Sequence, residues 1–244
     1  MPVGGMTVPQ SAMVLAAGLG TRLRPITDRV PKPLVSIGGK ALIDHAIDRL
    51  ADAGVPRLVV NVHYKSEMIA RHLEGRRTPA IALSHEQELL ETGGGILKAL
   101  PLLDEFFYVV NSDVFWLDGK VPALRRLART WDAARLDALL LLQRTTSALG
   151  YEGPGDFIMD PLGGVRRRRE REVAPHLFAG VQIVHRRLFD GQKPGKFSLN
   201  PLWDRALAAG RLAAIVHDGE WYHVGTPDAL ALAEARLVNH RIER

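Results

Sequence analysis

The chain has 244 residues, 46% apolar and 24% charged, a composition typical of globular proteins. It has no cysteine, which excludes disulfides, zinc–thiolate sites, iron–sulfur clusters and a cysteine nucleophile. Apolar runs such as Ala138–Leu142 are far shorter than the ~18 residues that a membrane helix needs, so we expect a cytoplasmic protein without a membrane span. The net charge of +5 favours small anions as much as nucleic acid.

Apolar periodicity divides the first part of the chain into alternating strands and helices. In chain order we predict a strand at 12–17, a helix at 41–53, a strand at 57–62, a helix at 65–74, a strand at 79–83, a helix at 94–103, a strand at 106–111, a helix at 121–132 and a strand at 136–142. This alternation, with nearly continuous apolar strands, predicts an α/β fold with a Rossmann-like, doubly wound and mostly parallel sheet.

The second part of the chain is less regular. We predict loop or hairpin at 150–164, a strand at 177–184, a helix at 200–209, a strand at 212–217 and a helix at 227–239 that is capped by Thr226. These elements use almost the whole chain. We therefore expect a loose extension at 1–10 and a single domain at 11–244.

A glycine-rich stretch, LAAGLGTRLRP, follows the first predicted strand at residues 15–25. Phosphates bind at this position in α/β sheets, because backbone N–H groups beside glycine can approach phosphate oxygens. Arg22 adds a planar charge that can bind a phosphate through two hydrogen bonds. The dinucleotide-binding and Walker patterns do not fit, so these glycines alone equally predict a plain tight turn.

Lys32 stands between two prolines in the sequence PKP at residues 31–33. Proline fixes its own φ and restricts the residue before it, so this segment would hold the lysine on a stiff support. The alternative is a surface turn with a solvated lysine.

Residues 15–34, LAAGLGTRLRPITDRVPKPL, resemble the N-terminal signature of the sugar-1-phosphate nucleotidyltransferases, L-A-A-G-x-G-T-R-L-x-P-x-T…P-K-P-L. Enzymes of that family convert an NTP and a sugar 1-phosphate into an NDP-sugar and pyrophosphate by in-line attack on the α-phosphorus. The resemblance implies a GT-A-like fold, with a nucleotide half at about 11–145 and a sugar-binding half at about 146–244. It also implies Mg²⁺ as cofactor, with Mn²⁺ as an alternative.

The resemblance implies roles for single residues. Arg22 would neutralise the β- and γ-phosphates, and Lys32 would bind the α-phosphate and the sugar phosphate as they react. Together with Asp113, these two residues form the expected catalytic set. The expected nucleotide contacts are Leu15, Ala16, Ala17, Gly18, Gly20, Thr21, Arg22, Glu88, Thr92, Gly93 and Gly94.

Asp113 follows the strong strand at 106–111 in the sequence VNSD. On its own it most simply predicts a turn or helix cap, but the related enzymes carry a metal-ligating Asp here, and carboxylate oxygen suits Mg²⁺. Their second metal ligand is the Asp of W-x-D-x-G-T. The corresponding sequence here is WYHVGT at 221–226, which places His223 at that position.

Imidazole is a better ligand for Mn²⁺ or Co²⁺ than for Mg²⁺. Three interpretations of His223 therefore stay open: it ligates a softer metal, it holds a metal-bound water, or Asp113 binds the metal with phosphates and water alone. A relative that binds nucleotide-sugars without catalysis is the extreme alternative.

The sequence ETGGG at 91–95 most resembles the uridylyltransferases that act on N-acetylmuramate 1-phosphate. Its plain alternative is a flexible helix entry. We expect UTP and N-acetylmuramic acid 1-phosphate as substrates. The alternatives are a mannose-1-phosphate guanylyltransferase, which usually shows G-T-A-G here, and a glucose-1-phosphate thymidylyl- or uridylyltransferase.

The expected sugar contacts are Asn111, Asp156, Phe178 and Gly180. For Asp156, in the sequence GPGDF, a hairpin turn is an equal alternative. The basic run Arg166–Arg171 favours a solvated hairpin, with a contact to an acidic sugar as the alternative. It lacks interleaved aromatic residues, so we expect no nucleic-acid partner. The sequence gives no indication of the oligomeric state.

Overall fold

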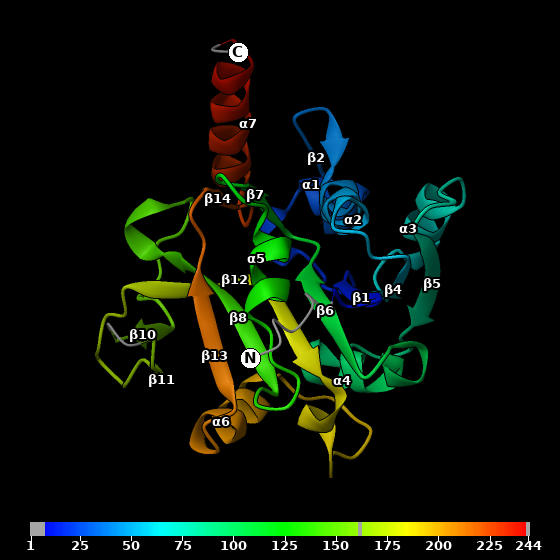
Figure 1. Ribbon diagram of the computed structural model, residues 1–244. Helices are drawn as coiled ribbons and strands as arrows, with labels where there is room; N and C mark the ends of the chain where they lie inside the picture. The colour runs from blue at the N-terminus through cyan, green and yellow to red at the C-terminus, as the bar shows by residue number, and fades with distance from the viewer. Residues whose placement is uncertain (1–7, 161–162, 243–244) are drawn as a thin grey trace.

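The computed structural model describes residues 8–160 and 163–242. Most of the extension predicted at 1–10 therefore lies outside the described residues. A central sheet of nine strands lies between two layers of helices (Figure 1). The strands of this sheet are β1 (Ser11–Leu15), β4 (Arg57–Val62), β5 (Ala80–His85), β6 (Phe106–Asn111), β8 (Ala138–Arg144), β10 (Phe157–Met159), β11 (Val165–Arg167), β12 (His176–His185) and β13 (Leu212–Val216).

Two small sheets accompany the large one. Their strands are β2 (Ser36–Ile37), β3 (Lys40–Ala41), β7 (Val114–Leu117), β9 (Ala148–Leu149) and β14 (Glu220–His223). The α-helices are α1 (Ile26–Arg29), α2 (Leu42–Asp52), α3 (Ser66–Leu73), α4 (Glu91–Ala99), α5 (Ala123–Thr130), α6 (Asn200–Ala208) and α7 (Pro227–Ile242). The 3₁₀ turns are η1 (Thr21–Leu23), η2 (Lys32–Leu34), η3 (Leu100–Leu102), η4 (Thr145–Ser147) and η5 (Arg186–Phe189).

The large sheet is mixed and mostly parallel, which confirms the predicted fold class. Its order is β11-β10-β12-β6-β1-β4-β5, with β8 paired to β12 and β13 paired to β8. Strands β5, β4, β1 and β6 run parallel, as do β8 and β13. Strand β12 runs antiparallel to both of its long neighbours, β6 and β8. Its nearly continuous apolar sequence therefore indicates that both faces of the strand are buried, and it does not indicate the direction of the strand.

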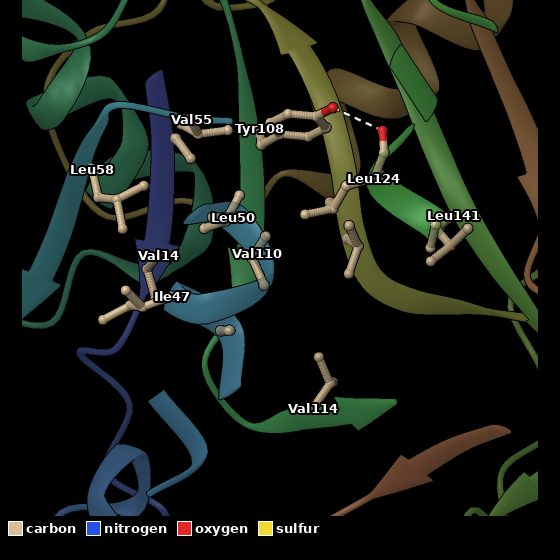
Figure 2. Packing of buried hydrophobic residues seen from close by; sticks show 14 of the residues in the cluster. Val14, Ile47, Leu50, Val55, Leu58, Tyr108, Val110, Val114, Leu124 and Leu141 are labelled. Carbon is tan, nitrogen blue, oxygen red and sulfur yellow. Dashed lines mark hydrogen bonds between the residues drawn. The ribbon is translucent and has the colours of Figure 1, made fainter. Parts of the chain in front are cut away.

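Helices α2, α3 and α5 cover one face of the sheet, and α4 and α6 cover the other. Figure 2 shows the first face, where Ile47 and Leu50 of α2 pack beside Val14 of β1 and Val110 of β6. All four side chains have no exposed surface. Helix α7 packs on the small sheet of β7, β14 and β9, and its far end projects from the body (Figure 1).

The predicted helix boundaries lie within two residues of those in the structure, except that α7 runs on to Ile242 and that α4 is displaced. This helix begins at Glu91, three residues before the predicted start, so its three glycines lie inside the first turns. A Cβ atom at Gly94 would lie 2.1 Å from the carbonyl oxygen of Gly195, so only glycine fits there. The predicted cap of α7 is confirmed, because the Ala229 N–H donates to Thr226 Oγ1 at 3.2 Å. Every helix within the described residues is too short or too polar to cross a lipid bilayer.

Tyr108 supplies a test of the packing in Figure 2. Its buried hydroxyl donates to the Leu124 carbonyl at 2.8 Å and ties β6 to α5. We expect Tyr108→Phe to lower the free energy of unfolding by about 1 kcal/mol, because the hydrogen bond is lost while the ring remains. Urea unfolding followed by circular dichroism measures this change. An unchanged midpoint and slope would contradict the assigned bond.

Candidate active site

A cavity of about 520 Å³ opens at the carboxyl ends of β1, β4 and β6. Ligand sites of open α/β sheets lie at this edge. The cavity is lined by Leu15, Ala16, Ala17, Gly18, Leu19, Gly20, Thr21, Arg22, Lys32, Pro33, Asn61, Leu89, Glu91, Thr92, Asn111, Ser112, Asp113, Ser198 and Gly225. The predicted nucleotide contacts from Leu15 to Arg22 are thus all on one wall, and Thr92, Asn111, Lys32 and Asp113 join them.

Polar residues from two strands flank the last residue of β1. Leu15 is in register with Asn61 of β4 on one side and with Asn111 of β6 on the other. Asn61 Oδ1 accepts from the Ala16 N–H at 2.8 Å, and Ser112 Oγ donates to the Leu15 carbonyl at 2.7 Å. These bonds fix the first residues of the glycine-rich loop where it leaves the sheet.

Gly20 lets the loop approach Lys32 closely. Its φ is +65°, in the left-handed region that favours glycine, and a Cβ there would lie 2.9 Å from the Cβ of Lys32. Thr27 Oγ1 donates to the Gly20 carbonyl at 2.9 Å and holds this turn in place. Arg22 follows in the turn η1, with its side chain exposed.

Lys32 and Asp113 form an ion pair on the cavity wall. Their Nζ and Oδ2 atoms are 2.8 Å apart, and the lysine is only 8% exposed, which contradicts the alternative of a solvated lysine in a surface turn. Burial would raise the pKa of Asp113, but the charge and hydrogen bond of the Lys32 ammonium, together with smaller contributions from His223 and the backbone, outweigh it, so the pKa lies below its ordinary value. The pair therefore presents a fixed cation and a carboxylate to the cavity at neutral pH.

The entry to α4 forms the opposite wall. Leu89, Glu91 and Thr92 line the cavity there, whereas the exposed Glu88 does not belong to its lining. The N–H groups of Gly93 and Gly94 donate to the Phe197 carbonyl at 2.9 and 3.1 Å. Because both N–H groups already donate to a protein carbonyl, their contact with a nucleotide stays a prediction that this geometry does not support.

Three of the four predicted sugar contacts lie away from the cavity lining. Asp156 Oδ2 accepts from the Phe178 N–H at 2.9 Å, and the Phe178 ring packs edge-on against Trp203. A Cβ at Gly180 would lie 2.9 Å from the Val114 side chain, so this glycine is packed under β7. Asn111 alone of the four lines the cavity.

His223 lies behind Gly225 and is not part of the cavity lining. A Cβ at Gly225 would lie 2.3 Å from His223 Nε2, and the imidazole stacks on Trp221 with ring centroids 6.0 Å apart. Burial lowers the pKa of His223, and the Lys32 ammonium lowers it further, while Asp113 opposes the shift. The imidazole is therefore neutral at pH 7.

The basic run Arg166–Arg171 forms β11 and the turn after it. Arg166 pairs with Glu172 at 2.6 Å, and Arg167 pairs with Asp204 at 2.8 Å while lying over the Trp203 ring. No residue of the run belongs to the cavity lining. The hairpin interpretation of this run fits the pairing of β10 with β11.

Sequence reasoning missed several residues of the lining: Leu19, Pro33, Asn61, Leu89, Glu91, Ser112, Ser198 and Gly225. Asn61 could have been predicted, because it is a polar amide near the end of an otherwise apolar strand. Ser198 carried no local signal, because it reaches the cavity through a contact between distant segments, in which the Leu199 N–H donates to Thr92 Oγ1 at 3.0 Å.

Comparison of the chain with known proteins identifies its family. Residues 11–151 match the family described as Nucleotidyl transferase. The chain is 45% identical to the N-acetylmuramate alpha-1-phosphate uridylyltransferase of Caulobacter vibrioides, over 94% of this chain and 97% of the relative. It is 34% identical to the enzyme with the same name in Neisseria meningitidis serogroup B, over 92% and 96%.

The chain belongs to the nucleotidyl transferase family, and the predicted class of enzyme, a sugar-1-phosphate nucleotidyltransferase, is confirmed. A solved structure of UDP-glucose pyrophosphorylase complexed with UDP-glucose has the same fold, with a TM-score of 0.79 and 17% identity over 96% of this chain and all of that one. Enzymes of this family generally use a divalent metal.

The Lys32–Asp113 pair yields a prediction about protonation. In Lys32→Met the effect of burial on Asp113 is countered only by the smaller contributions, so we expect the pKa of the Asp113 carboxyl to rise above its value in the unmodified protein. The pH at which the folded protein takes up this proton then moves upward. A ¹³C NMR titration of the carboxyl carbon measures the change, with Lys120→Met as the exposed-lysine control. Equal pKa values in both variants would contradict the pair.

Proposed function

We propose that this enzyme transfers the uridylyl group of UTP to N-acetylmuramic acid 1-phosphate, giving UDP-N-acetylmuramic acid and pyrophosphate. The observation that carries the proposal is the Lys32–Asp113 pair, held on the cavity wall beside a glycine-rich loop. The choice of base and sugar is supported by the two relatives, which match nearly their full lengths.

The phosphates would lie against the loop from Ala16 to Arg22. Backbone N–H groups beside glycine approach phosphate oxygens without steric conflict, and Arg22 brings a guanidinium to the same side. The opposite wall at Leu89–Thr92 would receive the uridine. Asn111 and Ser198 line the remaining space, where the sugar phosphate would enter.

The reaction needs positioning and neutralisation of charge more than covalent chemistry. A phosphate oxygen of the sugar 1-phosphate attacks the α-phosphorus of UTP, the new P–O bond forms, and the bond to the β-phosphate breaks as pyrophosphate leaves. Lys32 would neutralise the charge that gathers on the α-phosphoryl oxygens in the transition state, while Arg22 would neutralise the leaving pyrophosphate. Lys32 therefore acts on turnover more than on ground-state binding.

The donors at the site fit Mg²⁺ bound together with the substrate. Within the described residues no three His, Cys, Asp or Glu side chains gather to hold a metal. Asp113 lines the cavity beside Lys32, and we infer that its carboxylate would bind the ion together with the substrate. Mg²⁺ typically takes one or two carboxylates together with substrate phosphates and water. When bound, the ion supplies Lewis-acid stabilisation of phosphate charge. We place Asp113 as its ligand and keep His223 outside the coordination shell.

Release of pyrophosphate tests the proposed substrates. We expect turnover with UTP and N-acetylmuramic acid 1-phosphate to exceed that of every other pairing of UTP, GTP, ATP, CTP or dTTP with mannose, glucose or N-acetylglucosamine 1-phosphate. Highest turnover with GTP and mannose 1-phosphate would overturn the substrate but keep the chemistry. No turnover in any pairing would overturn both.

Lys32→Met tests the transition-state role. We expect kcat to fall by about 10²–10³-fold while the Kd for UTP changes only a few-fold, because the ammonium acts on charge that develops during reaction. Rapid-quench turnover and calorimetry separate the two effects. Lys120→Met, an exposed lysine outside the cavity lining, is the matched control. A loss of UTP binding as large as the loss of kcat would contradict this role.

His223→Asn tests the assigned metal ligand. We expect the ratio of turnover in Mg²⁺ to turnover in Mn²⁺ to stay within about twofold, since an imidazole outside the coordination shell cannot set metal preference. Mn²⁺ affinity, followed by electron paramagnetic resonance, should likewise persist in this variant and be lost in Asp113→Asn. A large shift of the ratio toward Mg²⁺ in His223→Asn would instead make the imidazole a ligand.

A further inference from the structure

A buried chain of hydrogen bonds joins the two walls of the cavity. Asn61 Oδ1 accepts from the Ala16 N–H at 2.8 Å, and Asn61 Nδ2 donates to Glu86 Oε1 at 2.7 Å. Glu86 Oε2 then accepts from the Leu90 N–H at 3.0 Å. Ala16 begins the glycine-rich loop and Leu90 precedes α4, so the chain connects the two segments across the ends of β4 and β5.

Both side chains of this chain are shielded from water. Asn61 is 2% exposed and Glu86 is 6% exposed. A buried polar group without a partner is costly, so each atom must meet a partner of the opposite kind. Asn61 faces a donor with its oxygen and a carboxylate with its nitrogen. The direction of every bond in the chain is thereby determined.

Helix α4 closes over the Asn61–Glu86 pair. A Cβ at Gly95 would lie 2.7 Å from Glu86 Oε1 and 2.9 Å from Asn61 Nδ2. Such distances are shorter than real Cβ contacts, so glycine is needed for the helix backbone to approach this closely. The close approach also leaves the two side chains little freedom to take other rotamers.

We propose that the Asn61–Glu86 pair sets the spacing between the glycine-rich loop and the segment Leu89–Thr92, and thereby positions the nucleotide between them. Asn61 and Glu86 are positioning residues, since the atoms described above bond to protein groups. This inference rests on the proposed function, because it requires that the cavity bind a nucleoside triphosphate.

Exchange of the two functional groups tests the pair. At a pH where both carboxyl groups are ionised, Asn61→Asp places a carboxylate oxygen against Glu86. Glu86→Gln places an amide N–H₂ against another donor. Each single variant therefore breaks the chain under these conditions. In the double variant Asn61→Asp/Glu86→Gln the new amide donates to the new carboxylate. That carboxylate still accepts from Ala16, and the amide oxygen still accepts from Leu90.

Calorimetric titration with UTP in Mg²⁺ measures the effect. We expect each single variant to raise the Kd and the KM for UTP at least tenfold with a smaller change in kcat, and the double variant to return within about threefold of the unmodified protein. Losses that add up in the double variant, or single variants with unchanged Kd, would overturn the inference.

Gln182→Glu is the matched control. Gln182 is 1% exposed and accepts from Trp203 Nε1 at 3.0 Å, outside the cavity lining. The same amide-to-acid change in this buried position should lower Tm and leave the Kd for UTP unchanged. This control separates an effect on nucleotide binding from the loss of stability that any buried charge would cause.

If a single variant fails to fold, Gly95→Ala displaces the pair through its new Cβ, and it should also raise the Kd for UTP at least tenfold. The titrations are repeated with GTP, ATP, CTP and dTTP. If the proposed base is wrong, the unmodified protein will prefer another nucleotide, and the variants are then compared with that nucleotide. If the unmodified protein binds no nucleotide, both the proposed function and this inference are overturned.

Discussion

The end of β1 imposes the constraint on which the site depends. There the backbone leaves the sheet, and its buried N–H and C=O groups need partners that strand pairing no longer supplies. The Ala16 N–H finds Asn61, and the Leu15 carbonyl accepts from both the N–H and the hydroxyl of Ser112. Because these partners come from the ends of β4 and β6, an apolar sheet acquires a polar edge. The cavity and its glycine-rich loop follow from that edge.

Charge is brought to this edge by segments outside the strands. Lys32 and Asp113 are 81 residues apart in the sequence and meet because η2 lies against the glycine-rich loop while Asp113 follows β6. Gly20 makes the approach of η2 sterically feasible. The ammonium keeps the pKa of the Asp113 carboxyl low, so that a fixed pair of opposite charges faces the space where phosphates would lie.

Local sequence patterns predicted much of this arrangement. The fold class followed from alternating periodicities, and the loop from Leu15 to Arg22 followed from a signature of consecutive residues. Contacts between distant segments were not predictable in the same way. The Phe197 carbonyl accepts from the Gly93 N–H, and the Asp156 carboxylate accepts from the Phe178 N–H. The polar groups of these two motifs, which suggested ligand contacts, therefore form hydrogen bonds within the protein. The local spacing of residues does not predict that an N–H will donate to a carbonyl more than a hundred residues away.

In the proposed function, the edge formed at β1 holds a nucleoside triphosphate between the loop and the entry to α4. A crystal structure of the protein with Mg²⁺ and a non-hydrolysable UTP analogue tests it most directly. We expect triphosphate oxygens against the backbone of residues 16–22, the metal on Asp113 and the base beside Leu89–Thr92. An analogue bound elsewhere, or bound in this cavity with its triphosphate turned away from the loop, would contradict it.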